Sequence, residues 1–179
     1  GGQSVAIGNI ASSGGELSAA LGSDASANFQ FSTALGSNTT AGAAGATALG
    51  NVATASGETS TAVGAGARAV GNNAIAVGTF ATANATESVA LGSSSSTTVA
   101  ATRSVAIGFG AVADEANTVS VGNGMTNRRI VNLAAGTAGT DAVNKTQLDA
   151  VGATATAAQN AANAAQGTAN TALANAATA

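Results

Sequence analysis

The sequence predicts a parallel β-solenoid that is followed by an Ala-rich helix. A five-residue motif ending in Gly recurs nine times between residues 4 and 122. Between its copies, small and polar residues alternate, which is typical of a strand with one buried face. The last 38 residues lose the motif and become rich in Ala, and Ala makes up 49 of the 179 residues of the chain.

The length of the repeat selects the solenoid. The motif reads SVAIG at 4–8 and ends as TVSVG at 118–122, and its glycines are 14 residues apart except for one step of 16. A coil of this length holds two short strands and two tight turns, but is too short for the helix pairs of helical repeat proteins. Coils stacked at about 4.8 Å would form a rod about 40 Å long. We expect the motif glycines to adopt positive φ at turns rather than to bind a ligand: Gly8, Gly22, Gly36, Gly50, Gly64, Gly78, Gly92, Gly108 and Gly122.

The motif strand carries apolar or small residues on both faces. The second residue before each Gly is Ala, except for Ser120, and the third is mostly Val, Thr or Ile. Strands of this kind are usually buried on both sides. The sequence leaves open which face carries the branched aliphatic residue that precedes each Gly: Ile7, Leu21, Leu35, Leu49, Val63, Val77, Leu91, Ile107 and Val121.

The second strand of each coil has a polar side. Small residues three and five positions after the Gly flank a polar one, as Ala53 and Ala55 flank Thr54. The sheet of the second strands is therefore exposed to water on its outer side, whereas the outer side of the motif sheet is apolar or small over nine coils. A monomer rarely exposes such a continuous patch. We predict a homo-oligomer that packs through the motif sheet.

The composition excludes most kinds of catalytic and metal-binding site. The chain has no His and no Cys, which excludes zinc, iron–sulfur and ordinary haem sites and Cys or His nucleophiles. The eight acidic residues are scattered, whereas a hydrolase needs paired carboxylates. Five basic residues and a net charge of −3 argue against nucleic acid. No apolar run reaches the roughly 18 residues of a membrane span. We expect no enzyme, no catalytic residue, no cofactor, no metal and no direct membrane contact.

The chain changes character after Gly122. Residues 126–147 hold three of the five basic residues, and we expect interchain salt bridges there among Arg128, Arg129, Asp141 and Lys145. Thr140 or Asp141 is a suitable cap for a helix from Ala142. Residues 148–179 favour a coiled coil over a frayed tail, in one of two registers. One register places Val151, Ala155 and Ala158 on the seam, the other Gly152, Ala155 and Gln159.

The SVAIG-type repeats resemble the head of trimeric autotransporter adhesins of the YadA type. The run from Arg129 to Thr137, with Thr140–Asn144 and Gln147–Leu148, is similar to the neck of that family. The resemblance implies a left-handed parallel β-roll head at 1–125, a neck at 126–147 in which each chain crosses to a neighbour, and a coiled-coil stalk at 148–179. It also implies a homotrimer on the bacterial cell surface, in the outer membrane, whose anchor is not in this chain.

The same resemblance implies adhesion to host extracellular matrix or cells, or autoaggregation, and hence a part in virulence. The alternative is an isolated structural or ice-binding solenoid, but Arg68 interrupts the Thr column that ice binding needs. Because aromatic residues are enriched at interfaces, the candidate ligand contacts are Phe29, Phe31, Phe80 and Phe109, although the same residues could plug turn corners. The 16-residue step predicts a bulged surface loop between Ser93 and Arg103.

Overall fold

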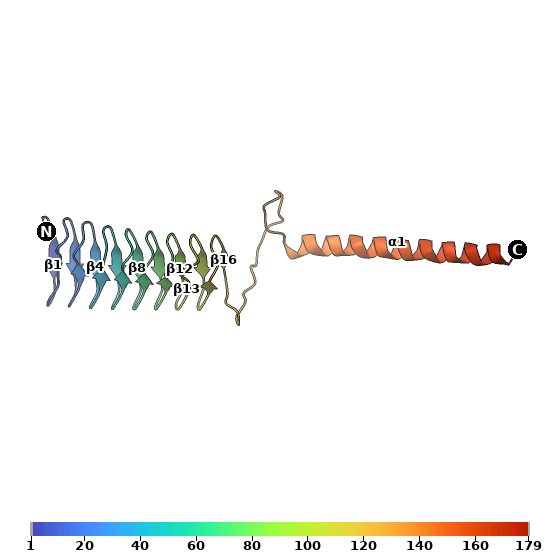
Figure 1. Ribbon diagram of the computed structural model, residues 1–179. Helices are drawn as coiled ribbons and strands as arrows, with labels where there is room; N and C mark the ends of the chain where they lie inside the picture. Colours follow the sequence, from blue (N-terminus) through green and yellow to red (C-terminus); the bar gives the residue numbers. More distant parts are fainter. Residues whose placement is uncertain (1, 179) are drawn as a thin grey trace. The chain divides into compact units, whose positions relative to one another are not determined.

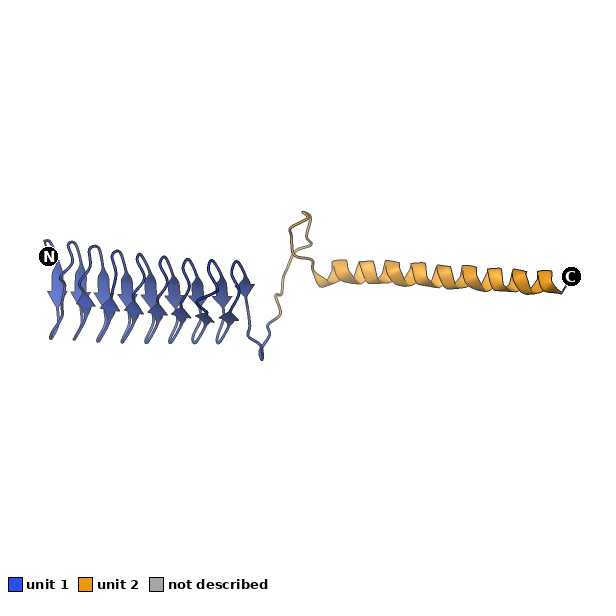
Figure 2. Cartoon of the chain, viewed as in Figure 1, with its two compact units in different colours: residues 1–128 blue, residues 129–179 orange. Residues whose placement is uncertain are grey.

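The computed structural model describes residues 2–178, so that Gly1 and Ala179, the outer ends of the predicted head and stalk, lie outside the described residues. The chain forms two compact units, residues 1–128 and 129–179 (Figure 2). The predicted boundary between head and neck, at 125/126, lies three residues before the division between the units.

The first unit is a β-solenoid with two parallel sheets, and this confirms the predicted fold class (Figure 1). The nine-stranded sheet holds the motif strands: β1 (Val5–Ile7), β2 (Ala19–Leu21), β4 (Thr33–Leu35), β6 (Thr47–Leu49), β8 (Thr61–Val63), β10 (Ile75–Val77), β12 (Val89–Leu91), β14 (Val105–Ile107) and β16 (Val119–Ser120). The seven-stranded sheet holds the intervening strands: β3 (Ser26–Ala27), β5 (Thr40–Ala41), β7 (Thr54–Ala55), β9 (Arg68–Ala69), β11 (Thr82–Ala83), β13 (Ser96–Thr97) and β15 (Val112–Ala113).

Neighbouring coils pair residue for residue. Leu35 lies opposite Leu49, which in turn lies opposite Val63. Each motif position therefore forms a straight column along the roll, and a property shared by nine motif copies becomes a property of one whole face.

The core of the roll is built from very small side chains. Ala48 and Ala62 of the motif strands and Ala53 and Ala55 of the other strands are fully buried. The largest fully buried side chains among the described residues are threonines and serines. The aliphatic column points outward, since Leu49 is 40% and Ile7 58% exposed, and this settles the orientation that the sequence left open.

Buried serines at the first motif position fasten the turn before five of the motif strands: Ser18, Ser32, Ser60, Ser88 and Ser104. These serines are buried, and each hydroxyl donates to the carbonyl three residues earlier, as Ser60 does to Gly57 at 2.7 Å and Ser104 to Ala101 at 2.6 Å. A buried hydroxyl needs such a partner.

Turns use positive φ more widely than the glycine column predicts. The motif glycines from Gly8 to Gly108 have φ between 107° and 139°, as expected. The prediction is wrong for Gly122, which has no positive φ, because the chain leaves the coil there and folds back toward Thr126. Two further positions per coil are left-handed without requiring Gly, such as Val52 at φ 58° and Thr59 at φ 52°.

The 16-residue step places its extra residues on the surface, as expected. The extra residues are Val99 and Ala100, which follow β13, and the side chain of Val99 is 77% exposed. Ala101 and Ser104 return to the buried positions that their equivalents occupy in other coils.

The second unit consists of a loop and one helix, α1 (Lys145–Ala177). Its cap is Asn144, not Thr140 or Asp141 as predicted. Asn144 is the N-cap because Gln147, three residues later, forms a reciprocal capping box with it. No described residue of α1 is buried, and an isolated helix poor in large side chains gains little stability from its own surface.

Candidate functional site

The outer side of the nine-stranded sheet carries an unbroken aliphatic column and, beside it, a second column that is apolar except for Thr33, Thr47 and Thr61. Ile7 is 58% exposed, Leu49 40% and Val119 66%. We call this surface the apolar face. It consists of the outward residues one and three positions before each motif Gly, among them Val5, Ile7, Leu21, Leu35, Leu49, Val63, Ile75, Val77, Leu91, Val105, Ile107, Val119 and Val121. The roll thus carries its large hydrophobic side chains outside and its small ones inside.

The outer side of the seven-stranded sheet is mostly polar. Its outward residues form two columns, which we call the polar face: Ser26, Thr40, Thr54, Arg68, Thr82, Ser96 and Val112 in one, and Asn28, Gly42, Ser56, Val70, Asn84, Thr98 and Asp114 in the other. The second column is not a Thr column, so the paired Thr array of an ice-binding solenoid is not formed.

The four phenylalanines lie at turns and are between 49% and 71% exposed, so they do not plug the interior. Phe29 and Phe31 follow β3, whereas Phe80 follows β10 and Phe109 follows β14. The structure therefore does not gather them into one cluster. The ring of Phe80 lies over Gly66 of the preceding coil, where a side-chain carbon would come within 2.6 Å of it.

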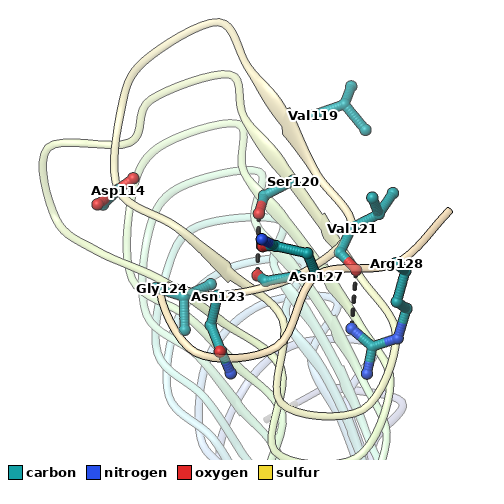
Figure 3. A pocket seen from close by; sticks show the side chains of 10 residues that line it. Asp114, Val119, Ser120, Val121, Asn123, Gly124, Asn127 and Arg128 are labelled. Carbon is teal, nitrogen blue, oxygen red and sulfur yellow. Dashed lines mark hydrogen bonds between the residues drawn. The ribbon is translucent and has the colours of Figure 1, made fainter.

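The C-terminal end of the roll is closed by the chain itself. After β16 the backbone folds back across the last coil and borders a hollow of about 570 Å³ (Figure 3). Asp114 and Ser120 line the hollow on the side of the coil, and Asn123 and Arg128 line it on the side of the returning chain. The guanidinium of Arg128 donates to the carbonyls of Val121, at 2.7 Å, and Phe109.

The loop of the second unit is ordered by side-chain bonds to its backbone. The Gln147 amide donates to the carbonyl of Gly136 and accepts from the N–H of Gly136, both at 2.9 Å. The Asp141 carboxylate accepts from the N–H groups of Thr137 and Ala138, both at 2.9 Å. These two bonds, that of Ala138 first, lower the pKa of Asp141.

Within this chain the four predicted salt-bridge residues do not pair with one another. Lys145 pairs with Asp149 one helical turn on, at 2.7 Å, and both side chains are exposed. The Asp141 carboxylate accepts a hydrogen bond from the backbone of its own loop, and the Arg128 guanidinium donates to backbone carbonyls. Salt bridges between chains stay a prediction.

The sequence did contain a signal for the true start of the helix. The pattern Asn144-x-x-Gln147 has the spacing of a capping box.

The described residues, 2–178, contain no group of three side chains suited to hold a metal ion. In the same range, no helix combines the length and hydropathy that membrane crossing requires.

Comparisons with known proteins identify the repeat. The family model "YadA head domain repeat (2 copies)" matches residues 13–39, 41–67, 69–95 and 100–124. The crystal structure of the collagen-binding domain of the Yersinia adhesin YadA matches with a TM-score of 0.65 and 31% sequence identity. The match covers 83% of this chain and 97% of that one. No curated protein sequence matches.

Proposed function

Because the chain belongs to the family of YadA head domains and is an adhesin head, we propose that three copies assemble on the bacterial cell surface and attach it to host extracellular matrix. The fold and the family are those of an adhesin, which is not an enzyme. The outer-membrane location and the part in virulence belong to the same proposal.

The observation that carries the assembly is the apolar face. Nine strands present aliphatic side chains outward, while the inside of the roll holds only Ala, Ser and Thr at full burial. Burial of this face against identical copies would remove from water the longest continuous row of large hydrophobic side chains on the roll. The number three comes from the family, since the face itself requires only closed symmetry. The interchain ion pairs of Arg129, Asp141 and Lys145 are part of this assembly.

The proposed ligand is a fibrous matrix protein, because the similar Yersinia structure is a collagen-binding domain. Packing through the apolar face leaves the polar face outside. Five of its seven strands present hydroxyl or amide groups, and neighbouring strands lie about 4.8 Å apart, which suits a long ligand that makes many weak contacts. The exposed phenylalanines at the turns are the proposed apolar contacts. Autoaggregation would use the same surfaces between heads on different cells.

Light scattering and binding to immobilised collagen test the two halves of the proposal separately. We expect a mass of about 50 kDa, three times the 16.5 kDa of one chain, and saturable binding. A triple variant with Thr40, Thr54 and Thr82 changed to Ala tests the polar face, and Phe80→Ala with Phe109→Ala tests the aromatic contacts. A folded monomer would refute the assembly. A trimer whose binding neither set of changes weakens would refute the assigned contacts.

A further inference from the structure

Every β-solenoid has an end at which the ladder of hydrogen bonds stops. In the inner coils, each motif Gly donates to the carbonyl that precedes the motif Gly of the coil before, as Gly64 does to Leu49 at 2.8 Å. The residue two positions on donates to the same preceding coil, as Gly66 does to Asn51 at 2.9 Å. Because the chain leaves the coil after Gly122, the carbonyl of Val121 has no further coil to meet, and the carbonyl of Phe109, one coil earlier, does not meet the donor that the repeat would place at residue 124.

The Arg128 side chain supplies both missing donors. One guanidinium nitrogen donates to Val121 at 2.7 Å and the other to Phe109. The surroundings of the motif glycines show the same replacement of next-coil backbone by the Arg128 side chain. At the inner glycines from Gly22 to Gly92, the atoms nearest to an added side-chain carbon belong to the backbone of the next coil, whereas at Gly108 the nearest is the guanidinium carbon of Arg128, at 3.2 Å.

We propose that Arg128 caps the C-terminal end of the roll by taking the place of the next coil's backbone (Figure 3). A forked guanidinium suits the role, since it presents several donors in a fixed geometry and can serve two carbonyls at once. This replaces the sequence-based role of Arg128 as a salt-bridge partner. It is independent of the proposed function, because all the contacts lie within one unit of one chain.

Asn123 positions the segment that carries the cap. Its side-chain oxygen accepts from the N–H groups of Met125, at 2.9 Å, and Thr126, at 2.7 Å, and its nitrogen donates to Gly110 at 2.8 Å. Beside it, the N–H of Val112 donates to Gly122 at 2.7 Å. These bonds hold the returning chain against the last coil and so bring Arg128 back over Gly108.

The consequence of the cap is that two carbonyls at the end of the ladder, those of Val121 and Phe109, are occupied. An uncapped row of backbone groups pairs readily with another chain, and repeat proteins need capping ends to stay soluble. Arg128 therefore ends the roll and keeps the ends of different heads from stacking on one another.

Arg128→Ala in the full chain tests the cap, with Arg129→Ala as a matched control. Both changes remove one positive charge at adjacent positions, but Arg129 has no hydrogen bond or ion pair among the described residues. In hydrogen exchange followed by mass spectrometry, we expect Arg128→Ala to speed exchange in residues 104–122 at least tenfold and to leave residues 33–63 unchanged. In sedimentation velocity, we expect it to form species that are multiples of the native mass. Arg129→Ala should leave the exchange of residues 104–122 at the native rate and should form no species larger than the native assembly.

Arg128→Lys separates the effect of the forked guanidinium geometry from the effect of the positive charge. An ammonium keeps the charge but cannot reproduce the two-carbonyl geometry, so we expect an exchange rate between the native and Ala values. If Arg128→Lys behaved as the native chain, charge alone would explain the residue and the cap would be refuted. Equal behaviour of Arg128→Ala and Arg129→Ala would refute it as well.

Discussion

Leu49→Asp, in the middle of the apolar face, is the sharpest test of assembly. Leu49 lies on β6 with Leu35 and Val63 beside it in the neighbouring strands, and 40% of it stays exposed in the single chain. Full burial of a Leu side chain stabilises by about 1.5–3 kcal/mol. Burial of the remaining exposed part at an interface therefore contributes about 1 kcal/mol per chain, or about 3 kcal/mol per trimer.

This estimate sets the size of the effect. Loss of about 3 kcal/mol corresponds to about a hundredfold weaker assembly, and this is the result expected for Leu49→Ala. Leu49→Asp adds the cost of burying three carboxylates without partners, which is several kcal/mol for each ion. We expect the Asp variant to be monomeric or unfolded at micromolar concentration.

The assay is light scattering with circular dichroism over a dilution series. Ser56→Asp, which places the same charge on the polar face, is the matched control and should keep both the native mass and the β signal. A stable trimer of Leu49→Asp with native β signal would show that the apolar face is not the interface. Loss of assembly by both variants would trace the effect to charge rather than to the face.

Three further predictions follow from the backbone and from one carboxylate. Val52→Asn should raise the free energy of unfolding by about 1 kcal/mol per chain in a denaturant titration, since a β-branched residue at φ 58° is strained and Asn tolerates this region; an unchanged or lower value would contradict this. Gly64→Ala should lower the melting temperature of the roll strongly, because φ of Gly64 is 131° and the added carbon would lie 2.6 Å from the carbonyl oxygen of Gly78 in the next coil. The control Gly124→Ala, where an added carbon has nothing within 4 Å, should melt at the native temperature. Since folding lowers the pKa of Asp141 from 3.8, its contribution should be present above about pH 4 and lost as the pH falls through the folded-state pKa; the amide resonances of its loop should follow this titration, and Asp141→Asn should abolish it.

The parts of the fold that the sequence predicts are those fixed by repetition. Nine copies of one motif determine the period, the two sheets and the Ala columns, because a feature seen once is ambiguous and a feature seen nine times in phase is not. The outward direction of Leu49 depends on the spacing between the sheets, and that spacing follows from packing of Ala against Ala in three dimensions. The left-handed positions of Val52 and Thr59 escaped prediction because each column mixes Gly and Asn with residues that disfavour this conformation.

The segment after Gly122 was the least predictable, because nothing in it repeats. Arg128 is one of three basic residues in a short stretch, and composition alone assigns it a charge partner. Its actual partners are two backbone carbonyls whose need for donors arises only where the stack of coils ends. Likewise, Thr140, Asp141 and Asn144 are all good caps, and the choice among them depends on Gln147 and on the loop bonds of Asp141.

The distribution of side-chain size links folding to assembly. A roll this narrow buries almost only Ala, Ser and Thr, and these gain little from leaving water compared with the Leu, Ile and Val that remain outside. The backbone ladder gives the coil its geometry, but hydrogen bonds exchanged with water contribute modestly to net stability. Most of the apolar stabilisation available to this sequence is therefore realised only when the apolar face meets other copies. It follows that the unfolding midpoint of the native chain should rise with protein concentration, as it does when the folded state is held together by association.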